Sequence, residues 1–347
     1  MGAARKRAPN PQVDHHVSRR SALDAAARLV HQICCVAGSA TLIEDARKAG
    51  GEKPLGRSIE RLDTPALFDW LVKTVSFQGV SDRAASEYMR KHGSITWLEI
   101  SYRLSKKPPC PKLQSYWHFH GCRYRKGNKT CARLDLIGHC PLPKHRLRNG
   151  RLNQSAYSLY FFLRDVADGD LVNWIDGRLS WASTCSSRHK LSRWRESILG
   201  PMRNIFGLGD KVLSMALADL LLAAQSGRDH WHRLGGNFVA IDTLVHKFFQ
   251  RTGILTLLGK RHRYGPTCYV DQGCNGAMMQ IANRIDARQF NREYPRFFPR
   301  FIQHAIWRFC AQDGLAVCNS NKISDRKRCG NLYCRVFRMC AREKINL

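Results

Sequence analysis

The chain has 347 residues, 44% of them hydrophobic, which is enough for one large domain or two ordinary ones with real cores. Its 57 lysine and arginine residues outnumber its 27 aspartate and glutamate residues and give a net charge of +30. A charge of this size predicts a polyanionic partner, either nucleic acid or an anionic membrane surface.

A membrane-bound protein is disfavoured by the hydropathy pattern. The longest apolar run, residues 212–224, contains Ser214 and Asp219 and is too short to span a bilayer. Residues 1–20 are basic and contain no apolar core segment, so we expect a disordered basic tail rather than a secretory signal. Nucleic acid is therefore the favoured partner.

The cysteine content indicates metal binding. Fourteen cysteines in a chain without an export signal argue against a disulfide framework and favour metal ligation. Some of them, such as Cys34, Cys35 and Cys185, are expected to be buried free thiols.

The N-terminal segment, residues 21–106, is predicted to be helical. A helix over residues 21–37 has Ser21 as its N-cap, and a Gly/Lys-rich linker follows at 47–57. Thr64 as N-cap and Pro65 at the first helical position begin the next helix, and another is expected over 81–92. The helix that follows Thr64 carries apolar residues on one face: Leu67, Phe68, Leu71, Val72 and Val75.

Residues 107–150 interrupt this pattern and are expected to form a basic insertion rich in cysteine and histidine. Its cysteine gaps, C-x11-C-x8-C-x8-C, match no common zinc finger, so a zinc site and a packed or nucleic-acid-facing surface are both open. The helical pattern resumes at Asn153, and no stretch shows sustained period-2 alternation, so the fold is predicted to be all-α. The candidate ligands are Cys110, Cys122, Cys131, Cys140, His118, His120, His139 and His145.

A glycine-containing turn between two predicted helices is the most informative feature of the chain. The first helix ends before Gly207, Leu208 and Gly209, and the second begins at Asp210. Two glycines around one apolar residue allow a tight turn, and the N–H groups of the following helix can then hold a phosphate. These properties are typical of a helix-hairpin-helix, which binds the DNA backbone without recognising base sequence. An ordinary helix–helix turn is the alternative.

Asp242 is predicted to cap a second amphipathic helix after a short apolar approach, VAID. Its apolar face is formed by Leu244, Val245, Phe248 and Phe249. Simple capping, which contributes roughly 1 kcal/mol, would by itself explain the aspartate.

Taken together, GLGDK at 207–211, IDTLV at 241–245 and RTG at 251–253 resemble the helix-hairpin-helix (HhH-GPD) DNA glycosylase superfamily, most closely its endonuclease III-like branch. Leu244 replaces the common histidine, and the longer spacing implies an insertion around 225–236. Residues 64–90 resemble the early segment of the family, in which Gln78 falls where relatives insert a glutamine into the gap left by a flipped nucleotide. A plain solvated turn is the alternative for Gln78. The resemblance covers about 65–90 and 157–340.

The resemblance implies a two-lobed fold with a DNA cleft between the lobes and with Lys211 and Asp242 on its wall. A lysine at this place in the family attacks the sugar C1′, forms a Schiff base and permits strand cleavage. A carboxylate such as Asp242 stabilises the oxocarbenium-like sugar and can orient or deprotonate the nucleophile. Phosphate contact alone is the alternative for Lys211, and a monofunctional glycosylase remains open.

The C-terminal cysteines Cys318, Cys329, Cys334 and Cys340 are spaced C-x10-C-x4-C-x5-C among basic residues. Endonuclease III relatives end in a four-cysteine loop that binds a structural [4Fe–4S] cluster and presents basic residues to DNA. The first two gaps are longer here than in the family, and Cys310 competes for the first ligand position. Iron–sulfur, zinc and no metal all remain open from the spacing.

The expected organisation is a tail at 1–20, helices at 21–106, the insertion at 107–150, a helical core at 151–308 and a cysteine-rich loop at 309–347. The expected function is base-excision repair of duplex DNA carrying a damaged or mismatched base, by a monomer in the cytoplasm, associated with the nucleoid in a bacterium. A noncatalytic DNA-binding protein and an RNA-binding zinc protein built around 110–140 are the alternatives.

Overall fold

The structure is a computed structural model that describes residues 11–76, 82–183, 190–225, 227–319 and 322–345. Helices dominate these residues, and their only strands are β1 (Tyr124–Arg125) and β2 (Thr130–Cys131). The two strands pair antiparallel with Tyr124 opposite Cys131. The predicted all-α class is therefore confirmed.

The chain forms two compact units. Residues 41–240 make one unit, here called the continuous unit, and residues 1–40 join residues 241–347 in the other, here called the split unit. The boundaries differ from those expected, because the predicted core at 151–308 is divided between the two units after Ala240. The hairpin falls in the continuous unit, and Asp242 and the C-terminal cysteines fall in the split unit.

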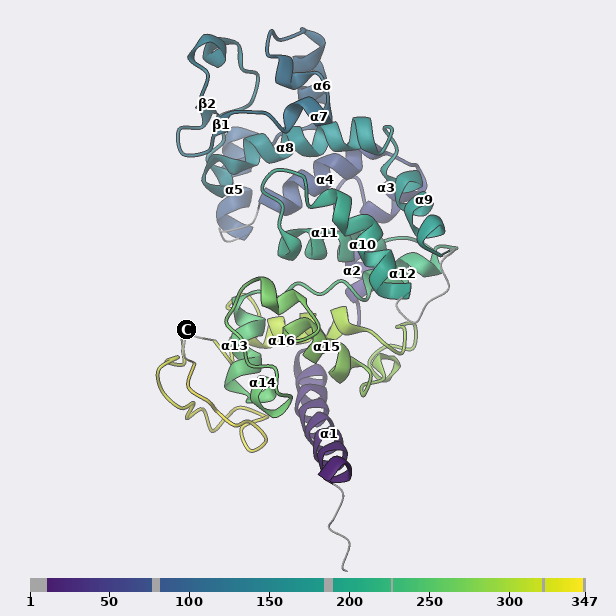
Figure 1. Cartoon of the computed structure of the whole chain (residues 1–347), viewed down its shortest axis with the longest axis vertical. Helices are drawn as coiled ribbons and strands as arrows, with labels where there is room; N and C mark the ends of the chain where they lie inside the picture. The colour runs from purple at the N-terminus through teal and green to yellow at the C-terminus, as the bar shows by residue number, and fades with distance from the viewer. Residues whose placement is uncertain (1–10, 77–81, 184–189, 226, 320–321, 346–347) are drawn as a thin grey trace, which may run out of the picture. The chain divides into compact units, whose positions relative to one another are not determined.

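The continuous unit contains most of the helices (Figure 1). Its long helices are α4 (Thr64–Ser76), α5 (Asp82–His92), α6 (Trp97–Ser105), α8 (Arg151–Phe161), α9 (Leu171–Ser183), α10 (Lys190–Met202) and α11 (Asp210–Leu222). Its shorter α-helices are α2 (Leu42–Lys48), α3 (Leu55–Glu60), α7 (Tyr116–Phe119) and α12 (Asp229–Gly235). Among the described residues it also contains three 3₁₀ segments, η1 (Pro111–Leu113), η2 (Leu134–His139) and η3 (Leu147–Gly150), and the π-helical η4 (Phe162–Val166).

Helix α11 lies at the core of this unit, which explains the apolar run at 212–224. Leu217, Leu221 and Leu222 are fully buried, and α11 packs against α2, α4, α10 and α12. A helix that is apolar on nearly all sides is expected in the interior of a large domain.

Helix α4 begins at the predicted place but with a different cap. Asp63 Oδ1 accepts a hydrogen bond from the Ala66 N–H at 2.9 Å, whereas Thr64 is buried and its Oγ1 accepts from the Leu171 N–H at 3.1 Å. The prediction of Thr64 as N-cap is therefore wrong, because the carboxylate one residue earlier reaches the first-turn N–H.

The split unit is built around its first and last helices. It contains α1 (Pro11–Ala37), α13 (Thr243–Arg251), α14 (Ile254–Leu257), α15 (Cys274–Ala282) and α16 (Pro299–Cys310), with the turns η5 (Pro266–Tyr269) and η6 (Ala287–Gln289). Helix α1 packs along α14, α15 and α16, and α13 packs on α16 (Figure 1). Segments from opposite ends of the chain thus share one core.

Helix α1 differs from the prediction in two respects. It begins at Pro11 rather than Ser21, so half of the segment expected to be a disordered tail is helical. Residues 1–10 lie outside the part of the chain that the structure describes. Cys34 is buried as expected, but Cys35 is exposed, because the next residue on a helix points about 100° away from a buried one.

No single helix among the described residues combines the length and apolar composition needed to cross a membrane. One bent pair, residues 20–37 with 42–48, meets both criteria together.

Candidate functional site

The predicted hairpin connects α10 to α11. Gly207 has φ +75°, and a β-carbon there would collide with the side chains of Arg151 and Ser155, so this position requires glycine. Leu208 is 6% exposed and packs inward, as expected of the residue that joins the two helices.

The turn is held by side chains from α8 and from the segment that precedes it. Arg148 Nη2 donates to the Gly207 carbonyl at 2.6 Å, and Ser158 Oγ accepts from the Phe206 N–H at 3.1 Å. Burial, and then the charge of Arg151, lower the pKa of the Arg148 guanidinium to about 10. The end of the cysteine-rich insertion therefore fixes the hairpin backbone.

The N-terminus of α11 is open. Gly209 is its N-cap, adopts an extended backbone with φ −95° and provides no side-chain cap. A β-carbon at Gly209 would meet no atom within 4 Å, and the residue is exposed. Because no contact within the protein requires a glycine here, its small size leaves room for an external group beside the first-turn N–H groups.

Lys211 lies half-buried in the first turn of α11. It forms no hydrogen bond or ion pair with the residues that the structure describes. The neighbouring Asp210 is engaged by Arg203, whose Nε lies 2.7 Å from Asp210 Oδ1 and which also pairs with Glu196 at 2.5 Å. Asp210 is therefore held by Arg203 rather than by Lys211.

Asp242 is the N-cap of α13, as predicted. Its Oδ1 accepts a hydrogen bond from the Val245 N–H at 2.9 Å, and the residue is half-buried. Burial raises the pKa of the Tyr264 hydroxyl, and the negative charge of Asp242 raises it further, which places this exposed ring in the electrostatic range of the carboxylate. Lys211 belongs to the continuous unit and Asp242 to the split unit, so their approach to one sugar stays a prediction.

The four predicted cysteines of the C-terminal loop line one pocket. They share it with Phe248 and Arg251 of α13 and with Thr252, the residue that follows this helix. Burial raises the pKa of the Cys340 thiol to about 11, and the other three cysteines also raise it. Cys310 is fully buried beside Cys318 but does not line the pocket, so Cys318 is the better first ligand.

The same loop is attached to the helix that Asp242 caps. Asp325 of the loop accepts from Lys247 Nζ at 2.6 Å and from Arg251 Nη2 at 2.5 Å, and the Glu343 N–H donates to the Arg251 carbonyl at 2.8 Å. Five basic side chains of the loop are exposed: Arg326, Lys327, Arg328, Arg335 and Arg338. The loop therefore presents positive charge while its inner side packs on α13.

A second cluster was missed from the sequence: His246, His262, Cys268 and Cys274 could hold a metal ion. One ligand atom from each of these residues lies within 4.8 Å of the others, and all but the half-buried His262 are buried. The thiol of Cys274 and the imidazole of His246 lower the pKa of the Cys268 thiol. The spacing, H-x15-H-x5-C-x5-C, has no familiar form, and Cys268 and Cys274 were expected to be structural.

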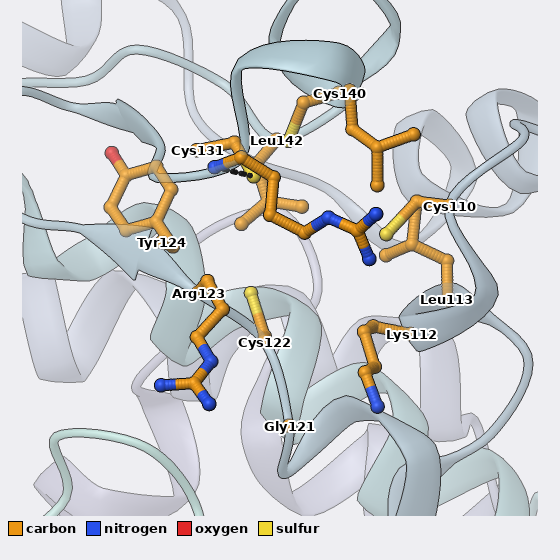
Figure 2. A pocket seen from close by; sticks show the side chains of 12 residues that line it. Cys110, Lys112, Leu113, Gly121, Cys122, Arg123, Tyr124, Cys131, Cys140 and Leu142 are labelled. Carbon is orange, nitrogen blue, oxygen red and sulfur yellow. Dashed lines mark hydrogen bonds between the residues drawn. The ribbon is translucent and has the colours of Figure 1, made fainter.

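A third cluster lies in the insertion. Cys110, Cys122, Cys131 and Cys140 line one cavity of about 270 Å³ with Lys112, Leu113, Gly121, Arg123, Tyr124, Arg133, Leu136 and Leu142. Figure 2 shows the four sulfur atoms turned towards the same space. Burial raises the pKa of the Cys122 thiol to about 11, and Cys140 and Cys110 contribute as well. The four histidines of the insertion do not line this cavity.

Two residues predicted to have a role, Gln78 and Cys185, lie outside the residues that the structure describes. The expected insertion at 225–236 contains α12, whose Trp231 is fully buried and donates to Asp176 Oδ1 at 2.5 Å. The longer spacing between hairpin and Asp242 is thus occupied by a packed helix.

Comparison with protein-family models, with curated proteins and with solved structures finds no match to this chain.

Proposed function

We propose that the protein is a helix-hairpin-helix DNA glycosylase with lyase activity, of the endonuclease III type. The observation that carries this proposal is the open end of α11. There an exposed Gly209 lies two residues before Lys211, which has no hydrogen-bond or ion-pair partner among the described residues. The Asp242 cap, the four-cysteine pocket behind α13 and the division into two units agree with the two-lobed fold expected from the resemblance.

The hairpin would bind the DNA backbone through the N–H groups at the start of α11. These groups carry the positive end of the helix dipole, and a phosphate oxygen can approach them over Gly209. The net charge of +30 and the exposed arginines of the C-terminal loop supply further phosphate attraction, which carries no sequence information.

Lys211 would supply the nucleophile. Its neutral amine attacks the sugar C1′ of a flipped nucleotide as the glycosidic bond breaks, and the base leaves with the bonding electron pair and gains a proton. The attached nitrogen then loses one proton, and its lone pair forms the C1′=N bond as the C1′–O4′ bond breaks and O4′ takes up a proton. The protonated Schiff base that results permits β-elimination of the 3′ phosphate.

Asp242 would stabilise the positive charge that develops on the sugar as the base departs. Capping by Oδ1 fixes the carboxylate on the backbone of α13, so its position is set before DNA arrives. Such fixed charges act without reorganisation during the reaction.

The four C-terminal cysteines fit a [4Fe–4S] cluster. The pocket wall supplies four thiols and no carboxylate, and Arg251 and Arg342 beside them suit the negative charge of a thiolate-bound cluster. A cluster held here would serve structure, and Cys318, Cys329, Cys334 and Cys340 would hold it.

Borohydride trapping on duplex DNA containing an abasic site tests the proposal. Wild-type protein should form a covalent adduct, Lys211→Gln should form none, and Lys73→Gln, an exposed lysine of α4, should match wild type. Absence of adduct and of base release on a panel of lesions with wild-type protein would instead establish a noncatalytic DNA-binding protein.

A further inference from the structure

We propose that His246, His262, Cys268 and Cys274 bind one zinc ion that fixes the helix capped by Asp242. This site is separate from the four-cysteine pocket and is not implied by the family resemblance. The zinc site stands on its own geometry, whereas its positioning effect on Asp242 rests on the proposed function.

The spacing of the four side chains suits a single tetrahedral ion. The Cys274 sulfur lies 3.2 Å from His246 Nδ1 and 3.4 Å from His262 Nε2, and the Cys268 sulfur lies 3.6 Å from His246 Nδ1. Zinc bonds of about 2.0–2.1 Å to nitrogen and 2.3 Å to sulfur place tetrahedral N and S ligands about 3.5 Å apart. The observed separations bracket that value.

The surroundings of the two imidazoles also favour ligation. His262 Nδ1 lies 2.7 Å from the Lys260 carbonyl, and a proton on Nδ1 leaves Nε2 to face the cluster as an acceptor. His246 is 1% exposed, and its Nε2 is buried without a hydrogen-bond partner among the described residues. Burying an imidazole with an unsatisfied nitrogen is costly, and a metal bond through Nδ1 would offset that cost.

The ion would join four segments of the split unit. His246 lies on α13, His262 follows α14, Cys268 is in η5 and Cys274 is the first residue of α15. The η5 segment that carries Cys268 also contacts the start of α13, because the Tyr269 hydroxyl donates to the Ile241 carbonyl at 2.7 Å. Asp242 precedes His246 by four residues, about one helical turn, so a metal on His246 fixes the helix directly behind the carboxylate.

Zinc content of purified full-length protein measures the proposal directly. Cys268→Ser combined with Cys274→Ser should lower the zinc content by one ion per chain relative to wild type. Cys34→Ala, which alters a buried cysteine of the same unit outside the cluster, should leave it unchanged. Equal zinc content in the double variant and wild type would overturn the proposal.

A ligand exchange separates metal binding from packing. His262→Ala should lose the ion, whereas His262→Cys should retain it, because a thiolate is an equally good zinc ligand. Zinc-edge X-ray absorption spectroscopy of wild-type protein identifies the atoms bound to zinc and needs no variant to fold. A zinc site with both sulfur and nitrogen neighbours supports the proposal, and zinc absent or bound by sulfur alone contradicts it. None of these readouts depends on glycosylase activity.

The cavity of the insertion carries a second, independent proposal: Cys110, Cys122, Cys131 and Cys140 hold a thiolate-bound metal centre. Four cysteines from a segment with little regular structure converge on one cavity, and no disulfide links them. Lys112 and Arg123 line it too, and their charges suit the net negative charge of four thiolates (Figure 2). A metal bound by four cysteines would explain how this segment, whose only strands are two residues long in the described part, holds one folded structure.

Metal and sulfide analysis tests this second site. Cys110→Ala with Cys131→Ala should remove one centre: loss of iron and sulfide would identify a cluster, and loss of zinc a single ion. Cys35→Ala, an exposed cysteine of α1, is the control. In wild-type protein the four thiols should resist alkylation until a chelator is added. Unchanged metal content, or free alkylation without chelator, would overturn the proposal.

Discussion

Two glycines of the hairpin, two residues apart, should respond to alanine in opposite ways. The fold itself requires glycine at 207, because φ there is +75° and an added β-carbon would collide with Arg151 and Ser155. Gly209 has an extended backbone and open space around it. If the turn binds phosphate, only Gly209→Ala should impair DNA binding without affecting the fold.

The magnitudes follow from these two environments. A left-handed conformation costs a residue other than glycine about 1–2 kcal/mol. The Ser155 hydroxyl, 2.8 Å from the added carbon, would have to move as well, so Gly207→Ala should lower the free energy of unfolding by about 2–3 kcal/mol. Gly209→Ala should lower it by less than about 1 kcal/mol, since the lower entropy of the unfolded chain offsets much of the loss of a better N-cap residue. Loss of one charge-assisted hydrogen bond to phosphate should weaken DNA binding about tenfold.

Urea unfolding and fluorescence anisotropy with a labelled abasic-site duplex, at one fixed salt concentration, measure both quantities. The expected pattern is a destabilised Gly207→Ala and a stable Gly209→Ala that binds weakly. A Gly209→Ala variant with wild-type stability and wild-type affinity would refute the assignment of the open end of α11 to DNA.

Three further outcomes are expected. Asp242→Asn should still cap α13, since asparagine is an equally good N-cap, but base release should fall about 10²- to 10³-fold in single-turnover assays; unchanged release would remove Asp242 from the chemistry. Burial, with Arg300 and Arg308, lowers the pKa of His304 to about 3. The unfolded state therefore binds more protons between pH 3 and 6.5, and stability should fall by about 2 kcal/mol from pH 7 to pH 5 in wild type but not in His304→Gln; parallel pH profiles would contradict this. Cys329→Ala should lose the brown colour and iron of the four-cysteine loop, while an iron-free wild type would exclude a cluster there.

Local patterns in the sequence were sufficient for several parts of the structure. The turn at Gly207 and the capping role of Asp242 were predicted from short-range rules, and both are confirmed. The four C-terminal cysteines line one pocket, a grouping that the family resemblance implied. These features depend on residues close together in the chain, where backbone geometry limits the alternatives.

Features that depend on distant segments were not predictable in the same way. The His246 cluster unites a helix with a loop ending 28 residues later, and H-x15-H-x5-C-x5-C offers no local rule that would pair them. The sharing of one core by α1 and the segment after Ile241 is likewise set by tertiary packing. Asp63 replaced Thr64 as the cap because the Thr64 hydroxyl is engaged by Leu171, more than 100 residues away.

The central claim is that the Lys211 amine becomes covalently joined to DNA. Mass-spectrometric mapping of the borohydride-trapped adduct tests it most directly, because it identifies the amine among the many lysines of the chain. The account predicts the reduced sugar on the peptide that contains Lys211. An adduct mapped to another lysine or to the N-terminal amine would contradict it.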